Sequence, residues 1–190
     1  MSRRAHRGVR VGFRGFWRDH RGVSAVEFAL IAPLLILMYC GMAELSLAMM
    51  AQRRLSNIAS AIGDLVAQNA QTGPAKTADI FKIGDTIMAP FTTTALQMCL
   101  ASVTSDAKGK NTVAWSRASV SDMANCPAQD AVLTDVPAGV LAASQTVILA
   151  RASYTYTPTI KLVFPGGVTF NRTFYLRPRR SDAVIWNAAS

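Results

Sequence analysis

The sequence predicts an α+β protein, in which a long N-terminal transmembrane helix continues into a small antiparallel β-sheet domain. Three observations predict it. An apolar run extends from Val23 to Met50, helical spacing of apolar residues follows up to about residue 72, and β-branched and aromatic residues dominate from about Gln97 onward. A chain of 190 residues can hold one modest domain plus an anchor, whereas two full domains would be crowded.

Residues 1–22 form a basic leader. Seven Arg and one Asp in this leader give a charge of +6, so only +3 of the formal +9 is spread over the rest of the chain. A basic arm can bind nucleic acid, but clustered Arg directly before an apolar run more often sets membrane orientation. We therefore expect contact with membrane lipids, no nucleic-acid partner, a cytoplasmic leader and a C-terminal part outside the cytoplasm, which in a bacterium is the periplasm.

Residues 23–50 are predicted to form a single transmembrane helix in the inner membrane. The charge-free centre, Phe28 to Ala43, has 16 residues between Glu27 and Glu44. As a helix these residues cover roughly 24 Å, slightly less than the ~30 Å hydrocarbon core, so both carboxylates are expected near the interfaces. The run is too long for a cleaved secretory signal, and we expect an anchor that stays.

Residues 51–72 are predicted to be an amphipathic extension of the same helix, ending near the run Gln71-Thr72-Gly73-Pro74. Apolar residues recur there at helical spacing, and Arg53, Asn57 and Asp64 lie on the opposite side. The apolar stripe consists of Leu55, Ile58, Ala59, Ile62, Leu65 and Val66. We expect this half of the helix to pack on the sheet.

Residues 73–190 are predicted to be a periplasmic α+β domain. A short helix opens it, capped by Thr77 and ended by Pro90, with a stripe of Ile80, Ile83, Ile87 and Met88. Residue types then predict strands near 97–104, 112–120, 145–156 and 168–175. A hairpin turn is expected at 105–111, a long loop at 121–144 and a second turn at Pro165-Gly166-Gly167.

Two cysteines of this domain, Cys99 and Cys126, are candidates for a disulfide, since oxidising conditions outside the cytoplasm permit one. The alternative is a pair of small buried thiols. Cys40 lies inside the predicted span. No C-x-x-C pair or Cys/His cluster is present, and we expect no metal and no cofactor.

Catalytic motifs do not stand out. Both histidines, His6 and His20, fall in the leader, and the sequence has no Gly-x-Ser-x-Gly, Ser-x-x-Lys or phosphate-loop pattern. We expect that the protein is not an enzyme and has no small-molecule substrate.

The junction between leader and helix places a charged residue inside the apolar run. A lone carboxylate, Glu27, follows Gly22 by five residues inside an apolar helix, where an unpaired charge costs several kcal/mol. Hydrolysis of the Gly22-Val23 bond would create an α-amino group on Val23 that is largely protonated at neutral pH. The amine of one subunit could then meet Glu27 of a neighbour, an attraction of about 4 kcal/mol at ~4 Å and an effective dielectric near 20.

These residues resemble the class III leader of type IV pilins, and residues 14–70 are similar to the TadE/TadG-like family of tight-adherence (Flp) pilus systems. The positions that match the family pattern are Gly22, Val26, Glu27, Phe28, Ala29, Leu30, Ala32, Pro33 and Glu44. The resemblance implies a pilin-like fold, cleavage after Gly22 by a prepilin peptidase, and a role as minor pilin or pseudopilin in building an adhesive pilus. Glu27, Phe28, Pro33 and Glu44 would then serve assembly or recognition.

The resemblance also implies partners: the prepilin peptidase, other minor and major pilins, and the inner-membrane pilus assembly platform. Major Flp pilins are little more than the helix and usually place Tyr after the Glu, whereas this chain has Phe28 and about 120 residues beyond residue 70. Both differences favour a minor component, either within the filament or acting only in its assembly.

Two alternatives stay open. Glu27 could simply lie at the cytosolic interface of an uncleaved anchor. The protein could then be a membrane-anchored periplasmic binding module that recognises a ligand through its sheet, for which a deep aromatic-lined pocket and an intact N-terminus would speak.

Overall fold

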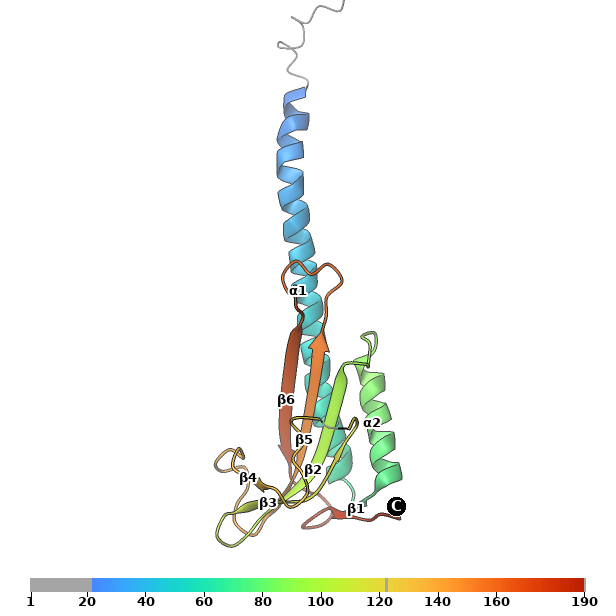
Figure 1. Cartoon of the computed structure of the whole chain (residues 1–190), viewed down its shortest axis with the longest axis vertical. Coiled ribbons are helices and arrows are strands. Elements are labelled where there is room, and N and C mark those ends of the chain that lie inside the picture. Colours follow the sequence, from blue (N-terminus) through green and yellow to red (C-terminus); the bar gives the residue numbers. More distant parts are fainter. Residues whose placement is uncertain (1–21, 122, 190) are drawn as a thin grey trace, which may run out of the picture. The chain divides into compact units, whose positions relative to one another are not determined.

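The computed structural model describes residues 22–121 and 123–189 (Figure 1). In chain order its elements are Val23–Ala67 (α1), Gln71–Thr72 (β1), Pro74–Met88 (α2), Leu96–Ser105 (β2), Asn111–Ala118 (β3), Val132–Leu133 (β4), Thr146–Tyr156 (β5), Val168–Leu176 (β6) and Ile185–Trp186 (β7). A long apolar helix followed by a mostly antiparallel sheet confirms the predicted α+β class. The leader, apart from Gly22, lies outside the described residues.

The chain is divided into two compact units, with the boundary between Ala43 and Glu44. The described part of the first unit is Gly22 and the start of α1, whose side chains from Val23 to Ala43 are exposed or half-exposed. The helix runs without a break through Pro33. By length and composition α1 can cross a membrane, and its most apolar stretch is not buried within the described residues. Such a helix fits a single-pass membrane anchor.

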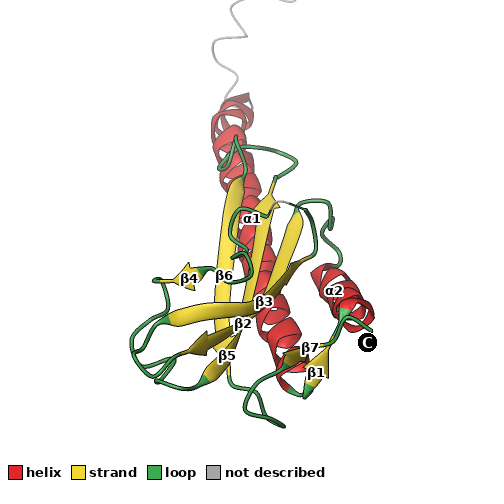
Figure 2. Ribbon diagram, turned by 60° about the horizontal axis from the view of Figure 1, so that its bottom comes forward, coloured by secondary structure: helices red, strands yellow, loops and turns green. Residues whose placement is uncertain are grey.

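The second unit is built around a five-stranded antiparallel sheet with strand order β4-β3-β2-β5-β6 (Figure 2). Two hairpins, β2–β3 and β5–β6, are joined by the long pairing of β2 with β5, in which Leu100 lies opposite Ala150. Asp106 fixes the first hairpin turn because its Oδ1 accepts the backbone N–H groups of Lys108 and Lys110, both at 2.8 Å. The four long strands lie where the sequence predicts them.

One face of the sheet is covered by the second half of α1 and by α2 (Figure 2). The predicted helix stripe supplies the core, with Leu55, Ile58 and Ile62 fully buried. Gly63 lets the helix approach closely, since a Cβ there would lie 2.5 Å from Leu176 Cδ1 and 2.9 Å from Ala150 Cβ. The packing of α1 on the sheet is therefore as the amphipathic pattern indicates.

The opposite face of the sheet carries a smaller apolar cluster. Val103, Val113 and Leu149 are buried there beneath the long connection between β3 and β5. A disulfide joins Cys99 on β2 to Cys126 in that connection, with a Cα–Cα distance of 5.5 Å. Because β2 and β5 are covered on both faces, most of their residues are buried, instead of alternating between buried and exposed.

The start of α2 differs from the prediction. The residue before its first turn is Gly73, followed by Pro74, whose ring suits the first helical position. Thr77 lies inside the helix, where its hydroxyl donates to the Gly73 carbonyl at 2.8 Å, so the prediction that it caps the helix is wrong. The buried side is Ile80, Gly84 and Met88, whereas Ile83 is 43% exposed.

The end of α1 also differs, because the helix stops at Ala67 rather than at residue 72. The Ala67 carbonyl accepts the backbone N–H of Arg179 at 2.9 Å, and Arg179 pairs with Asp64 at 2.5 Å. The next residues form β1, which pairs in parallel with β7. The C-terminal segment thus supplies hydrogen-bond and ion-pair partners to the end of the helix.

Candidate functional site

Gly22 and Val23 stand at the very start of the described chain. Gly22 is exposed, and a Cβ built on it would meet no atom within 4 Å. The α-helix begins at Val23. The predicted cleavage bond therefore lies at the boundary between leader and helix, in open space within the described residues.

Glu27 lies one helical turn after Val23, so the two residues share a face of α1. Glu27 is exposed, as are its neighbour Phe28, at 69%, and Pro33. All three lie in the first unit, on the helical stretch that is apolar apart from this one carboxylate. The arrangement presents a single acidic group on an exposed apolar surface.

Glu44, the first residue of the second unit, has a different environment. Only 2% of its surface is exposed, and its two carboxylate oxygens accept the backbone N–H of Val163 at 2.5 Å and that of Leu162 at 3.2 Å. Hydrogen bonds to an ionised acceptor are stronger than neutral ones and stabilise a buried charge. Glu44, expected from the sequence near a membrane interface, holds a loop of the second unit in place through these two bonds.

Leu162 and Val163 belong to residues 157–167, the connection between β5 and β6, called here the β5–β6 loop. Lys161 within it has φ of 59°, a left-handed conformation that costs a non-glycine residue about 1 kcal/mol. The adjacent bonds to Glu44 offset that cost. Ile160, Leu162 and Val163 nevertheless keep 57%, 43% and 39% of their surfaces exposed.

Tyr156, at the end of β5, completes the surroundings of Glu44. Burial raises the pKa of Tyr156 above its ordinary value, and the negative charge of Glu44 adds to the effect. Phe91 packs edge-on against its ring, with centroids 6.0 Å apart. Neutral tyrosine is therefore favoured beside the buried carboxylate.

The hydrogen bonds between Glu44 and the β5–β6 loop could not be predicted from the sequence, because Leu162 and Val163 lie 118 and 119 residues after Glu44. A signal was available: a carboxylate at the end of an apolar run needs a partner when it is buried. The position of Glu44 at the end of the apolar run indicates only a membrane interface, and nothing in the loop's own residues marks its backbone amides as donors.

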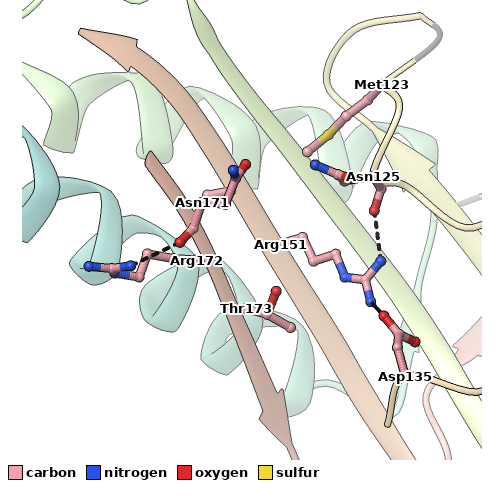
Figure 3. A pocket seen from close by; sticks show the side chains of 8 residues that line it. Met123, Asn125, Asp135, Arg151, Asn171, Arg172 and Thr173 are labelled. Atoms are coloured by element: carbon pink, nitrogen blue, oxygen red, sulfur yellow. Dashed lines mark hydrogen bonds and ion pairs between the residues drawn. The ribbon is translucent and has the colours of Figure 1, made fainter. Parts of the chain in front are cut away.

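Two shallow grooves of the second unit bear on the alternative of a binding module. One of about 220 Å³ beside α1 is lined partly by Leu47, Phe91, Tyr154 and Tyr156. The other, of about 280 Å³, lies on the sheet's far side and is polar (Figure 3). There Arg151 pairs with Asp135 and donates to the Asn125 carbonyl at 2.9 Å, so its charge is already engaged.

Comparison with known proteins concerns the segment that begins at Gly22 and contains Glu27 and Glu44. Residues 22–63 match the model of the TadE-like protein family. Searches among curated proteins and among solved structures found no match to this chain. A TadE-like match indicates involvement in tight-adherence pilus systems. It begins at the glycine before α1 and includes Glu27, Phe28, Pro33 and Glu44. The resemblance seen in the sequence is thereby confirmed, and residues 22–63 of this chain are a TadE-like segment.

Proposed function

We propose that this chain is a minor pilin or pseudopilin that takes part in assembling a tight-adherence type IV pilus. One observation carries the proposal: the TadE-like match begins at Gly22, the residue directly before α1, and includes Glu27 on an exposed apolar helix. A prepilin peptidase cleaves after Gly22. The mature protein then begins at Val23, the first residue of the helix.

Glu27 is the residue through which the helix recognises its neighbours. In lipid, an unpaired carboxylate is costly, so Glu27 favours any arrangement that supplies a cation. The new amino group of another mature subunit is such a cation. Each helix therefore enters the assembly in the register that brings its Glu27 to a neighbouring N-terminus.

The second unit supplies specificity rather than catalysis. The basic leader keeps the N-terminus in the cytoplasm, which places Glu44–Ser190 in the periplasm. A folded domain of this size is more than a filament repeat needs, which favours a minor component that contacts other pilins and the inner-membrane assembly platform. We assign it no enzymatic activity.

The first test is N-terminal sequencing of the protein from host membranes, with and without the prepilin peptidase. The mature chain is expected to begin at Val23 only when the peptidase is present. A chain that begins at Met1 or Ser2 in both strains would exclude processing.

The second test replaces Glu27. Glu27→Gln keeps the size of the side chain but removes its charge, so it should leave membrane insertion and cleavage intact while pilus assembly fails. Glu27→Asp keeps the charge and should retain part of the assembly. Leu35→Ala, at another exposed position of the same helix and outside the family pattern, is the control. Normal piliation in the Glu27→Gln strain would remove the assigned role.

A second candidate function, an uncleaved membrane-anchored binding module, is favoured by the groove lined by Phe91, Tyr154 and Tyr156. The same sequencing experiment separates the two. An intact N-terminus, together with unchanged piliation in a strain that lacks the protein, would put the binding module first.

A further inference from the structure

We propose that the β5–β6 loop of the second unit binds the surface of the lipid bilayer that holds the start of α1, through Ile160, Lys161, Leu162 and Val163. The proposal rests on the part of the proposed function that anchors α1 in a membrane. It does not rest on cleavage, on Glu27 or on pilus assembly.

The exposed apolar surface of α1 extends past the end of its charge-free run. Beyond Glu44, exposed apolar side chains continue at Leu45, Leu47, Met49 and Met50, each between 43% and 54% exposed. The next charged residue in the chain is Arg53. From Phe28 to Leu47 a helix covers about 29 Å, close to the ~30 Å hydrocarbon core that the run from Phe28 to Ala43 fails to fill, so residue 44 lies only about 5 Å inside the edge of that core.

Glu44 is the one charged residue inside this longer run. An exposed Glu44 would stop the bilayer at residue 44, because a carboxylate in hydrocarbon is expensive. In the structure Glu44 is buried and its oxygens accept two backbone N–H groups from Leu162 and Val163. The loop therefore shields the charge, and the apolar surface can pass Glu44 without exposing it to lipid.

The β5–β6 loop itself combines a fixed position with exposed apolar side chains. Its hydrogen bonds fix it beside the residue where the charge-free run ends. It presents Ile160, Leu162 and Val163 to the outside, with exposed Lys161 between them. Apolar side chains interleaved with a cation are the pattern by which peripheral segments enter the boundary between headgroups and acyl chains.

Charge and continuity favour lipid over another protein as the occupant. The loop contains no Asp or Glu, and the segment 45–54 of α1 contains none either, whereas Lys161 and Arg53 are both exposed. This combination suits a surface of phosphate headgroups, with anionic lipids preferred. The loop is also hydrogen-bonded to Glu44, directly before the residues that continue α1's own apolar run, so one partner can cover both.

The test uses the full chain in liposomes, with Cys40→Ser to remove the free thiol and the Cys99–Cys126 disulfide left intact. Leu162→Cys is labelled with the fluorophore NBD, and lipids brominated near the headgroup end of the acyl chain serve as quenchers. Val132→Cys, at an exposed apolar position on β4, is the matched control. Quenching at position 162 is expected to be several times that at position 132.

Further variants test the physical cause. Lys161→Glu should lower quenching at position 162 in liposomes containing phosphatidylglycerol, whereas Lys108→Glu, in the exposed turn between β2 and β3, should not. Glu44→Gln should also lower it, because the loop loses its fixed position. Equal quenching at positions 162 and 132 overturns the proposal.

A protein occupant would give another result. If NBD at position 162 is unquenched in liposomes but becomes shielded when a pilin is co-reconstituted, the loop binds protein and the lipid proposal fails. These outcomes are separate from the proposed function. A chain that keeps its leader can still show lipid quenching, and a chain that begins at Val23 can still lack it.

Discussion

The carboxylate of Glu44 accepts the backbone N–H of Val163, 119 residues further along the chain, at 2.5 Å. Together with the bond from Leu162, this contact ties the β5–β6 loop to the first residue of the second unit. The same acidic residue lies at the end of the charge-free apolar run and inside the TadE-like segment. Its described contacts are structural, in contrast to exposed Glu27.

Glu44→Gln should weaken this attachment. Glutamine keeps one acceptor oxygen but turns an N–H₂ group toward a backbone N–H, so one charge-assisted bond is lost, at a cost of about 1.5–3 kcal/mol in the free energy of unfolding of the second unit. Denaturation of the full chain in detergent micelles, followed by Trp fluorescence, measures the change. Amide exchange at Leu162 and Val163 should accelerate. Glu27→Gln should change neither quantity. Unaltered amide protection in Glu44→Gln would contradict the attachment of the β5–β6 loop through Glu44.

Removing the Cys99–Cys126 disulfide should destabilise the second unit. The bridge spans 27 residues of sequence, for which restriction of the unfolded chain gives about 3.5 kcal/mol. The double variant Cys99→Ser, Cys126→Ser should therefore unfold at a markedly lower denaturant concentration. Cys40→Ser serves as the control, because Cys40 lies in the first unit, outside the bridge. Equal midpoints for all variants would show that the bridge does not constrain the domain.

Gly63→Ala should cost more stability than Gly84→Ala. At Gly63 the added Cβ would meet Ala150 Cβ at 2.9 Å and Leu176 Cδ1 at 2.5 Å, and the alanine methyl is fixed to the sheet backbone. At Gly84 the nearest atom belongs to the flexible side chain of Met98, which can move. We expect about 1–3 kcal/mol for the first change and a smaller loss for the second. Thermal unfolding of the two variants side by side measures the difference, and the reverse order would contradict the close helix–sheet approach.

Alkaline pH should destabilise the second unit through Tyr156. Because burial and the charge of Glu44 raise the pKa of Tyr156 in the folded state, the folded protein holds this proton more tightly than the unfolded chain. Its contribution to stability is complete below the unfolded pKa of about 10 and is lost as the pH rises through the raised pKa. Denaturation at a series of pH values from 8 upward should show a steeper decline for the parent chain than for Tyr156→Phe. Parallel declines would mean that Tyr156 titrates normally.

The elements that the sequence predicts well are those whose signal is local. The strands near 97–104 and 145–156 are runs of apolar and β-branched residues, and the Asp106–Lys110 turn has its own hydrogen bonds. The stripe of α1 follows from the 3.6-residue period alone. For the candidate site, the family pattern around Gly22 and Glu27 is equally local, and the comparison with known proteins matches it.

The elements that escaped prediction depend on distant partners or on a competing local choice. Strands β1 and β7 have two residues each, too few for any period, and exist because they pair with one another. Thr77 has the right residue type for a cap, but Pro74 three positions earlier starts the helix first. The hydrogen bonds of Glu44 join segments that only the finished fold brings together.

The apolar stripe of α1 is synthesised well before β5, the strand against which it is buried. A ribosome finishes Leu55, Ile58 and Ile62 long before it makes Thr146–Tyr156, the strand on which their cluster closes. At about 5–20 residues per second, the 84 residues from Ile62 to Thr146 take roughly 4–17 s, during which the stripe is uncovered. During that interval the nascent helix exposes an apolar surface that is prone to aggregation. We therefore expect either delayed release of the chain from the ribosome or binding of a chaperone to this surface.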